Sequence, residues 1–460
     1  MSQPATQQAL RKEAAELFQA GIDAADPYLA VQRSLSTDGL RLEIALSTKN
    51  KTPNDNAPKR TGHWPKIHVI AFGKAACNMA KAARDIIPES LLAGDGTIVT
   101  NYENAAQIPG FKVIGAGHPI PDEAGLQGSR LITDRITNAQ SGELALVLIS
   151  GGGSALLPYP RPPITLEEKA QTTASLLACG ATINQVNCVR KHLSMIKGGG
   201  LARFAAPADL HALILSDVLG DDLSAIASGP TVPDETRFDD AVAILREKGI
   251  WESIPDSVKY VLQQGTAGNI PETPKTDDEL FNNAGHTLIG SNTISLKAVV
   301  KAASQLDYDV RVYSEHLNGE AKDEAFKLAS YAKSLLDSGL NRPIALLAGG
   351  ETTVTLTGQG LGGRNQEMGL AFSLAAERLA LQGNWVFLSG GTDGRDGPTD
   401  AAGALIDPQS LARMRAAGID PGARLQDNDS YRALQASNDL LITGATGTNV
   451  ADLQVLLLRP

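Results

Sequence analysis

Short apolar runs, several of them followed by glycine, recur along this chain, and they limit its fold more than any other feature does. Both faces of such a run are apolar, which is typical of parallel strands buried between layers of crossover helices. The segment after Gly73 adds an apolar stripe at helical spacing. The pattern predicts an α/β fold with doubly wound, largely parallel sheets. The runs are Ile67–Phe72, Leu144–Ile149, Leu210–Leu215, Ile344–Ala348, Trp385–Leu388 and Leu440–Ile442.

The length of 460 residues indicates more than one core. Residues 264–283 are rich in glycine, proline and acids, so we expect an N-terminal, Rossmann-like α/β domain over 1–275 and a C-terminal α/β domain over 276–460. The run Gln454–Leu458 has no helix after it, and a return of this last strand to the first domain is left open. In open α/β sheets ligands bind beyond the carboxyl ends of the strands, so we expect the site among the loops there.

Composition excludes several classes of partner. The net charge of -10 and the aromatic content of 4% argue against a nucleic-acid partner. The 3 cysteines form no CxxC or Cys/His cluster, which predicts a reducing compartment without structural zinc. No signal peptide and no membrane-spanning run is apparent. We therefore expect a cytoplasmic protein without a membrane partner, and a homodimer stays an open option.

Glycine-rich loops follow three of the predicted strands. Successive glycines let backbone N–H groups approach an anion closely. One loop supplies Gly151, Gly152, Gly153 and Ser154, and another supplies Gly349 and Gly350. No loop is a Walker A motif, and no segment gives a full dinucleotide fingerprint. We expect these six residues to bind substrate or phosphate.

Four basic residues accompany these loops. Lys74 begins a helix after a strand, where a cation opposes the helix dipole and so needs a function such as phosphate pairing. Arg364 lies in a glycine-rich loop before a helical pattern, a position that suits a hydrogen-bond donor to the charged transition state. The alternative is that Arg364 forms a salt bridge. Arg190 and Lys197 are expected to hold a carboxylate or phosphate, or else to form a solvated basic face.

Acidic residues provide the other half of a phosphoryl-transfer site. Asp217, Glu351 and Asp393 follow predicted strands, and we expect them to be catalytic. Magnesium takes one or two carboxylates together with phosphate oxygens, so Asp217, Asp221 and Asp393 are the predicted metal ligands. Asp222 and Asp400 fit turn or helix-cap roles better.

Long motifs in order along the chain resemble the class II glycerate kinases, the glycerate 2-kinase family with a MOFRL region. The resemblance implies ATP-dependent phosphorylation of D-glycerate to 2-phosphoglycerate with Mg²⁺ or another divalent cation. It also implies an active-site cleft between the two α/β domains. The resemblance also implies a functional role for Asn449, which composition and spacing do not single out. The motifs are FGKAACNMA (72–80), GAGHPIPDEAG (115–125), LISGGGSALL (148–157), VRKHLSMIKGGGLA (189–202), LSDVLGDDLSAIASGPTVPD (215–234), AGGETTVTLTGQGLGGRNQEMGLAF (348–372), SGGTDGRDGPTDAAGA (389–404) and TGTNVADL (446–453).

Two other functions stay open. Members of the same family have been called hydroxypyruvate reductases, and an NAD(P)H-dependent reductase is one alternative. The chain lacks the GxGxxG sequence and acidic ribose partner that a nicotinamide site would need. A non-catalytic sensor of sugar phosphates is the other alternative, although it would have little use for so many acids.

Overall fold

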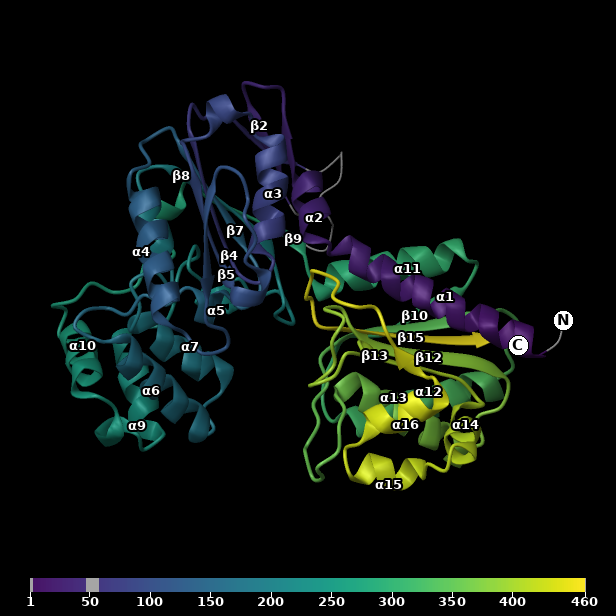
Figure 1. The fold of residues 1–460 in the computed structure, drawn as a ribbon. Coiled ribbons are helices and arrows are strands. Elements are labelled where there is room, and N and C mark those ends of the chain that lie inside the picture. The colour runs from purple at the N-terminus through teal and green to yellow at the C-terminus, as the bar shows by residue number, and fades with distance from the viewer. Residues whose placement is uncertain (1–2, 47–57, 460) are drawn as a thin grey trace. The chain divides into compact units, whose positions relative to one another are not determined.

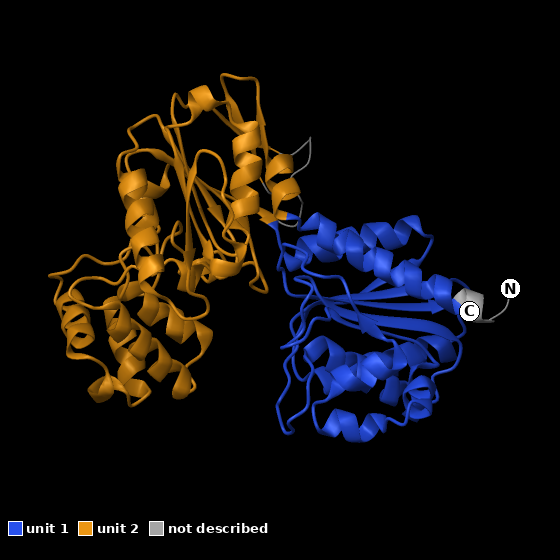
Figure 2. Ribbon diagram, viewed as in Figure 1, with its two compact units in different colours: residues 1–26, 290–460 blue, residues 27–289 orange. Residues whose placement is uncertain are grey.

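The computed structural model describes residues 3–46 and 58–459. The chain forms two compact units (Figure 2), unit 2 over 27–289 and unit 1 over 1–26 together with 290–460. Within the described ranges, no helix is both long and apolar enough to cross a bilayer.

Unit 2 is built on a six-stranded sheet in the order β6-β5-β4-β7-β8-β9. The pairs β4/β5, β4/β7, β5/β6 and β7/β8 are all parallel. Every residue of β4 and β7 is buried, as expected for central strands with helices on both sides. These strands are β4 (Ile67–Phe72), β5 (Gly96–Asn101), β6 (Phe111–Ala116), β7 (Leu144–Ile149), β8 (Asp209–Leu215) and β9 (Ala284–Gly290).

The helices of unit 2 form two groups. Those beside the sheet are α2 (Pro27–Ser34), α3 (Ala76–Ile86), α4 (Glu123–Thr137), α5 (Gly153–Leu156) and α8 (Gly200–Ala205). A separate helical cluster, visible in Figure 1, consists of α6 (Leu166–Ala178), α7 (Ile183–His192), α9 (Phe238–Glu247) and α10 (Asp256–Thr266). Its core is centred on Phe238, Val189 and Val258. A small antiparallel sheet contains β1 (Leu35–Thr37), β2 (Leu42–Ala45) and β3 (Lys59–Gly62).

Unit 1 contains the second six-stranded sheet, in the order β10-β11-β15-β12-β13-β14. Helices cover both of its faces, and a separate hydrophobic cluster lies on each face. Its strands are β10 (Asp309–Leu317), β11 (Ile344–Gly350), β12 (Asn384–Gly391), β13 (Gly403–Ile406), β14 (Leu440–Leu441) and β15 (Asp452–Arg459). Its helices are α1 (Gln3–Ala24), α11 (Asn292–Gln305), α12 (Ala321–Asp337), α13 (Arg364–Arg378), α14 (Ser410–Ala416), α15 (Pro421–Gln426) and α16 (Ser430–Ser437).

The predicted α/β architecture with two sheets is confirmed, but the strand directions in unit 1 correct one detail. Among the strands that the structure describes in unit 1, only β10 and β11 pair in parallel, whereas β15 lies antiparallel between β11 and β12. The pairs β12/β13 and β13/β14 are antiparallel as well. An unbroken apolar run reports burial of both faces of a strand, and it carries no information about direction.

The division of the chain also differs from the one expected at 275/276. β9 completes the sheet of unit 2, which places the division at 289/290. β15 lies inside the sheet of unit 1, so the last strand does not return to the N-terminal unit. The first helix, α1, packs through Leu17 and Phe18 in the same core as Leu453 and Val455 of β15. Both chain ends therefore belong to unit 1.

Candidate functional site

The turn after β4 in unit 2 is tied to the glycine-rich loop after β7. The N–H of Lys74 donates to the carbonyl of Gly151 at 2.9 Å, and the N–H of Ala75 donates to Ser150 Oγ at 3.0 Å. Gly73 has φ +117°, and a Cβ atom there would lie 2.3 Å from Ser150 Oγ. Glycine is needed at this position for both reasons. The two loops therefore form one structure at the carboxyl ends of adjacent parallel strands.

Three ionisable side chains surround this double loop. A Cβ atom at Gly151 would lie 2.2 Å from Asp217 Oδ2, and one at Gly152 would lie 3.1 Å from His118 Nε2 and 3.3 Å from Lys74 Cγ. Because Gly151 and Gly152 have no side chains, these three residues can pack directly against the loop backbone. Lys74, His118 and Asp217 come from the ends of three different strands and meet at Gly151 and Gly152.

The electrostatics of these groups reflect partial burial beside a cation. Burial raises the pKa of Asp217, and the nearby charge of Lys74 acts in the opposite direction. Burial and the repulsion of Lys74 lower the pKa of His118. No side chain in the described part of unit 2 hydrogen-bonds the Asp217 carboxylate. An incompletely coordinated carboxylate beside a lysine fits a site for a divalent cation and phosphate.

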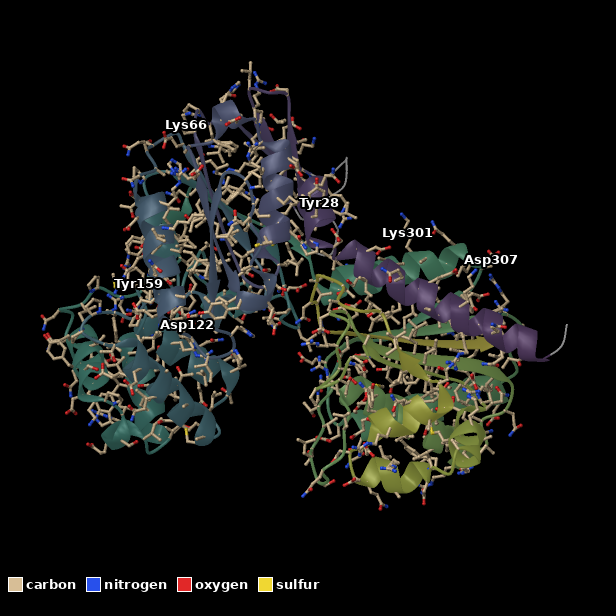
Figure 3. All side chains as sticks on the ribbon, in the orientation of Figure 1. Tyr28, Lys66, Asp122, Tyr159, Lys301 and Asp307 are labelled. Atoms are coloured by element: carbon tan, nitrogen blue, oxygen red, sulfur yellow. The ribbon has the colours of Figure 1, made fainter. Side chains whose placement is uncertain are left out.

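The loop that carries His118 is fixed by Asp122, which is labelled in Figure 3. Asp122 Oδ1 accepts from the N–H of Gly125 at 2.9 Å and so caps α4. Its other oxygen accepts from the hydroxyl of Tyr102 at 2.5 Å. This anchoring fixes the loop whose His118 ring lies beside Gly152.

Ser154 and Lys197 extend the same loop. Lys197 Nζ donates to the carbonyl of Ser154 at 3.0 Å and contacts the carbonyl of Ala227 at 3.4 Å. Ser154 Oγ lies 2.8 Å from Ser228 Oγ, whose hydroxyl donates to Asn187 Oδ1 at 3.1 Å. Lys197 is only 3% exposed, so it is a buried cation and not part of a solvated face.

A second candidate cluster lies in unit 1 at the start of α13. Arg364 Nε and Nη2 donate to the carboxylate of Asp452 at 2.6 and 2.9 Å, and Arg364 Nη1 lies 2.7 Å from Glu351 Oε1. The salt bridge considered as the alternative for Arg364 is therefore present, with Asp452 and Glu351 as its partners. Arg364 keeps 34% of its side chain exposed and can still face a ligand.

Asp396 lies beside this pair and caps α13. Its oxygens accept from the N–H groups of Asn365 at 3.1 Å and Gln366 at 2.8 Å. Burial raises the pKa of Asp396 to about 7, and the negative charge of Asp452 raises this pKa further. The hydrogen bond from the N–H of Gln366 acts in the opposite direction. This residue is adjacent to the predicted ones, and sequence reasoning did not select it as functional.

Asp393 lies beside the same cluster, and Asp393 and Asn449 are each held by a local turn. Asp393 Oδ1 accepts from the N–H of Arg395 at 3.0 Å, and a Cβ atom at Gly391 would lie 3.2 Å from Asp393 Oδ1 and 3.6 Å from Asp452 Oδ1. Asn449 Oδ1 accepts from the N–H of Ala451 at 3.2 Å. In the sequence Asn449 precedes Asp452, the buried partner of Arg364, by three residues.

Gly349 and Gly350 have packing roles that the sequence did not reveal. A Cβ atom at Gly349 would lie 2.2 Å from Asn292 Oδ1, and one at Gly350 would lie 2.1 Å from the carbonyl of Leu317. Asn292 in turn donates to the carbonyls of Val450 and Asp452, both at 2.8 Å. These glycines permit close backbone packing around Asp452.

The predicted metal ligands are divided between the units. Asp217 and Asp221 belong to unit 2, and Asp393 belongs to unit 1. Across residues 3–46 and 58–459, no group of three or more His, Cys, Asp or Glu side chains is arranged to hold a metal. Asp222 makes turn contacts, since its oxygen accepts from the N–H of Ser224 at 2.9 Å. Asp400 accepts from the hydroxyl of Tyr431 at 2.7 Å.

Two family models match the chain. One is described as a domain of unknown function (DUF4147) and covers residues 13–263, and the other is the MOFRL family, over residues 344–452. The first match begins in α1 of unit 1 and continues through most of unit 2.

Known proteins resemble the chain over nearly its whole length. A glycerate 2-kinase from Pyrococcus horikoshii is 39% identical, and the match covers 97% of both chains. A protein from Agrobacterium vitis, provisionally named a hydroxypyruvate reductase, is 41% identical over 96% of this chain and 93% of its own length. The crystal structure of a glycerate kinase from Thermotoga maritima superposes with a TM-score of 0.85 at 37% identity, covering 98% of this chain and 100% of that one.

Proposed function

The chain belongs to the glycerate kinase family that carries a MOFRL domain, and on this basis we propose that it transfers the γ-phosphoryl group of ATP to the 2-hydroxyl of D-glycerate. The observation that carries the proposal is the near-complete match to a glycerate 2-kinase together with the arrangement of Lys74 and Asp217 around Gly151. A lysine, a free carboxylate and glycine N–H groups at strand ends are the parts that phosphoryl transfer requires.

In unit 2 we assign Lys74 to the phosphate oxygens, where an ammonium group stabilises the charge of the transition state. Backbone N–H groups of Gly151, Gly152 and Gly153 would orient the same phosphates. Asp217 would hold Mg²⁺, with Asp221 reaching it directly or through water. When bound, Mg²⁺ neutralises phosphate charge, as it does in other kinases.

In unit 1 we assign Arg364 to the transferring phosphoryl group as well. Asp452 and Glu351 fix the plane of the Arg364 guanidinium, so this group is already oriented before substrate binds. Asp393 would orient the 2-hydroxyl of glycerate and receive its proton, since a carboxylate can act as the general base for such a hydroxyl. Asn449 would support ligand binding beside it. Glu351, which is 43% exposed, would offset part of the positive charge of Arg364 through their ion pair.

The A. vitis relative makes hydroxypyruvate reduction the second candidate. Purified protein is assayed for ADP release with D-glycerate, ATP and Mg²⁺, and in parallel for oxidation of NADH and NADPH with hydroxypyruvate. The kinase proposal predicts ADP release that depends on D-glycerate and no nicotinamide oxidation. Nicotinamide oxidation without ADP release would favour the reductase, and binding without either reaction would favour a sensor.

A further inference from the structure

Three basic side chains of unit 2 carry charge without a carboxylate partner. They are Lys169 on α6, Arg190 on α7 and Lys197 just after α7. Among the residues that the structure describes, no Asp or Glu oxygen lies within 4.0 Å of any of the three. Lys169 is 6% exposed and Lys197 is 3% exposed. We call this group the cationic cluster.

Lys169 is the most unusual member. Its Nζ atom is buried and has no hydrogen-bond partner within residues 3–46 and 58–459. Burial lowers the pKa of Lys169 to about 7, and the charges of Arg190 and Arg161 lower it further. Burial likewise lowers the pKa of Lys197, followed by repulsion from Lys169 and Arg190. The three cations are therefore close enough to destabilise one another.

A neighbouring lysine shows that this arrangement is not forced by the fold. Lys191, next to Arg190 on α7, is also buried, and its Nζ lies 3.2 Å from Asp234 Oδ1. That pairing is the ordinary solution for a buried cation, because an unpaired one is costly. The cationic cluster lacks this solution, which indicates that its counter-charge comes from a ligand.

The cluster adjoins the loop assigned to the phosphoryl group. Lys197 contacts the carbonyl and hydroxyl of Ser154, one residue after Gly153. It also contacts the carbonyl of Ala227, and Ala227 and Ser228 both have left-handed backbones, with φ +51° and +61°. Such conformations are costly for residues other than glycine and concentrate at ligand sites. Arg190 is half-buried, and its guanidinium forms no hydrogen bond or ion pair with any residue that the structure describes, so it is the member that can meet a ligand.

We propose that Arg190, supported by the charges of Lys169 and Lys197, binds the carboxylate of the acceptor substrate next to the Gly151–Ser154 loop. This inference rests on the proposed function and names the part of the substrate that the cluster recognises. In a 2-hydroxy acid the carboxylate is attached to the carbon that bears the reacting hydroxyl, so its binding site must adjoin the phosphoryl site. A planar guanidinium matches a carboxylate with two parallel hydrogen bonds.

The test compares Arg190→Gln and Arg190→Lys with Arg130→Gln, a control that removes an exposed arginine on α4 of the same unit. Steady-state kinetics give separate KM values for D-glycerate and ATP. Arg190→Gln is expected to raise the KM for D-glycerate by about ten- to a hundredfold, the effect of losing one charge-assisted pair, with the KM for ATP almost unchanged. Arg190→Lys should recover part of the loss, and Arg130→Gln should behave as wild type.

An unchanged KM for D-glycerate in Arg190→Gln would overturn the inference while leaving the kinase function in place. A rise in the KM for ATP instead would also overturn it, because the cluster would then bind the nucleotide phosphates. If the wild type does not phosphorylate D-glycerate at all, the proposed function fails and the inference fails with it.

A binding measurement covers the case in which kinetics are lost. Lys169→Met removes the buried charge and keeps much of the side-chain volume, so the ligand-free protein should show a higher Tm than wild type. Addition of D-glycerate without ATP should raise the Tm of wild type and raise that of Lys169→Met less. An equal shift in both proteins, or a lower Tm for ligand-free Lys169→Met, would contradict the assignment.

Discussion

The guanidinium of Arg364 is bound by the buried carboxylate of Asp452, with Nε to Oδ2 at 2.6 Å and Nη2 to Oδ1 at 2.9 Å. Asp452 begins β15, and β15 lies between β11 and β12, the strands that carry the loops with Glu351 and Asp393. A strand from the very end of the chain therefore positions the arginine that we assign to phosphoryl transfer.

Replacing Asp452 by asparagine should destabilise unit 1. The change leaves Arg364 without its main charge partner, and breaking a fully buried pair costs roughly 3–5 kcal/mol. Since about a third of the Arg364 side chain is exposed, solvent screening should reduce the loss to about 2 kcal/mol. Urea unfolding of Asp452→Asn and wild type measures the difference, and identical midpoints would show that the pair contributes nothing to stability.

Lys74→Ala should lower kcat without affecting the fold. Every hydrogen bond that Lys74 forms with the described residues uses its backbone, so the fold does not depend on the ammonium group. Loss of a cation that stabilises a transferring phosphoryl group is expected to reduce kcat by about 10³-fold. Steady-state kinetics with circular dichroism separate the two effects. A near-normal kcat would remove Lys74 from the catalytic site.

Arg364→Ala differs from Lys74→Ala because Arg364 is tied into the core. We expect a similar fall in kcat, by about 10³-fold, together with a lower unfolding midpoint. Loss of stability in Arg364→Ala with kcat intact would make the residue purely structural.

Asp393→Asn, which keeps the size of the side chain, should reduce kcat strongly and leave the midpoint unchanged.

Gly151→Ala tests the close approach between the glycine loop and Asp217. The new methyl group would lie 2.2 Å from Asp217 Oδ2, so the carboxylate or the loop must move. A displacement of about 1 Å in an active site can reduce turnover by about 10²-fold. Gly422→Ala is the matched control, because its nearest contact is 3.4 Å away and its backbone is unstrained. Equal kcat values for the two variants would show that Asp217 need not be held in place.

Asp396 should make stability depend on pH. Folding raises the pKa of Asp396 from 3.8 to about 7, so between these values the folded state holds a proton that the unfolded state has released. The stability associated with this group is greatest below the lower value and is lost as the pH rises to the upper one. Relative to Asp396→Asn, wild type should therefore become less stable between about pH 4 and about pH 7. Parallel pH profiles of Tm for the two proteins would contradict the shifted pKa.

The central strands of unit 2 could be predicted from the sequence, because a strand buried on both faces is itself an unbroken run of apolar residues. The predicted runs Ile67–Phe72 and Leu144–Ile149 coincide with β4 and β7. The direction of β15 and the packing of α1 against it depend on contacts between opposite ends of the chain, for which no local pattern exists. Long-range pairing of this kind could not be predicted from apolar periodicity.

The candidate site was predicted in part for similar reasons. Lys74 and the glycines after β7 are recognisable because they follow a strand directly. Asp452 was missed, since a single acid before an apolar run has no distinctive pattern. Lys169 was missed as well, because a lysine in a helix that contains Glu167 and Glu168 looks like part of an exposed surface. Only the three-dimensional structure places its ammonium group inside the protein.

Phosphorus NMR of the reaction product tests the central claim most directly. Wild-type protein is incubated with D-glycerate, ATP and Mg²⁺, and the product spectrum is compared with those of authentic 2- and 3-phosphoglycerate. The account predicts 2-phosphoglycerate and ADP in equal amounts. Formation of 3-phosphoglycerate would contradict the proposed acceptor hydroxyl, and the absence of any phosphorylated glycerate would contradict the kinase function itself.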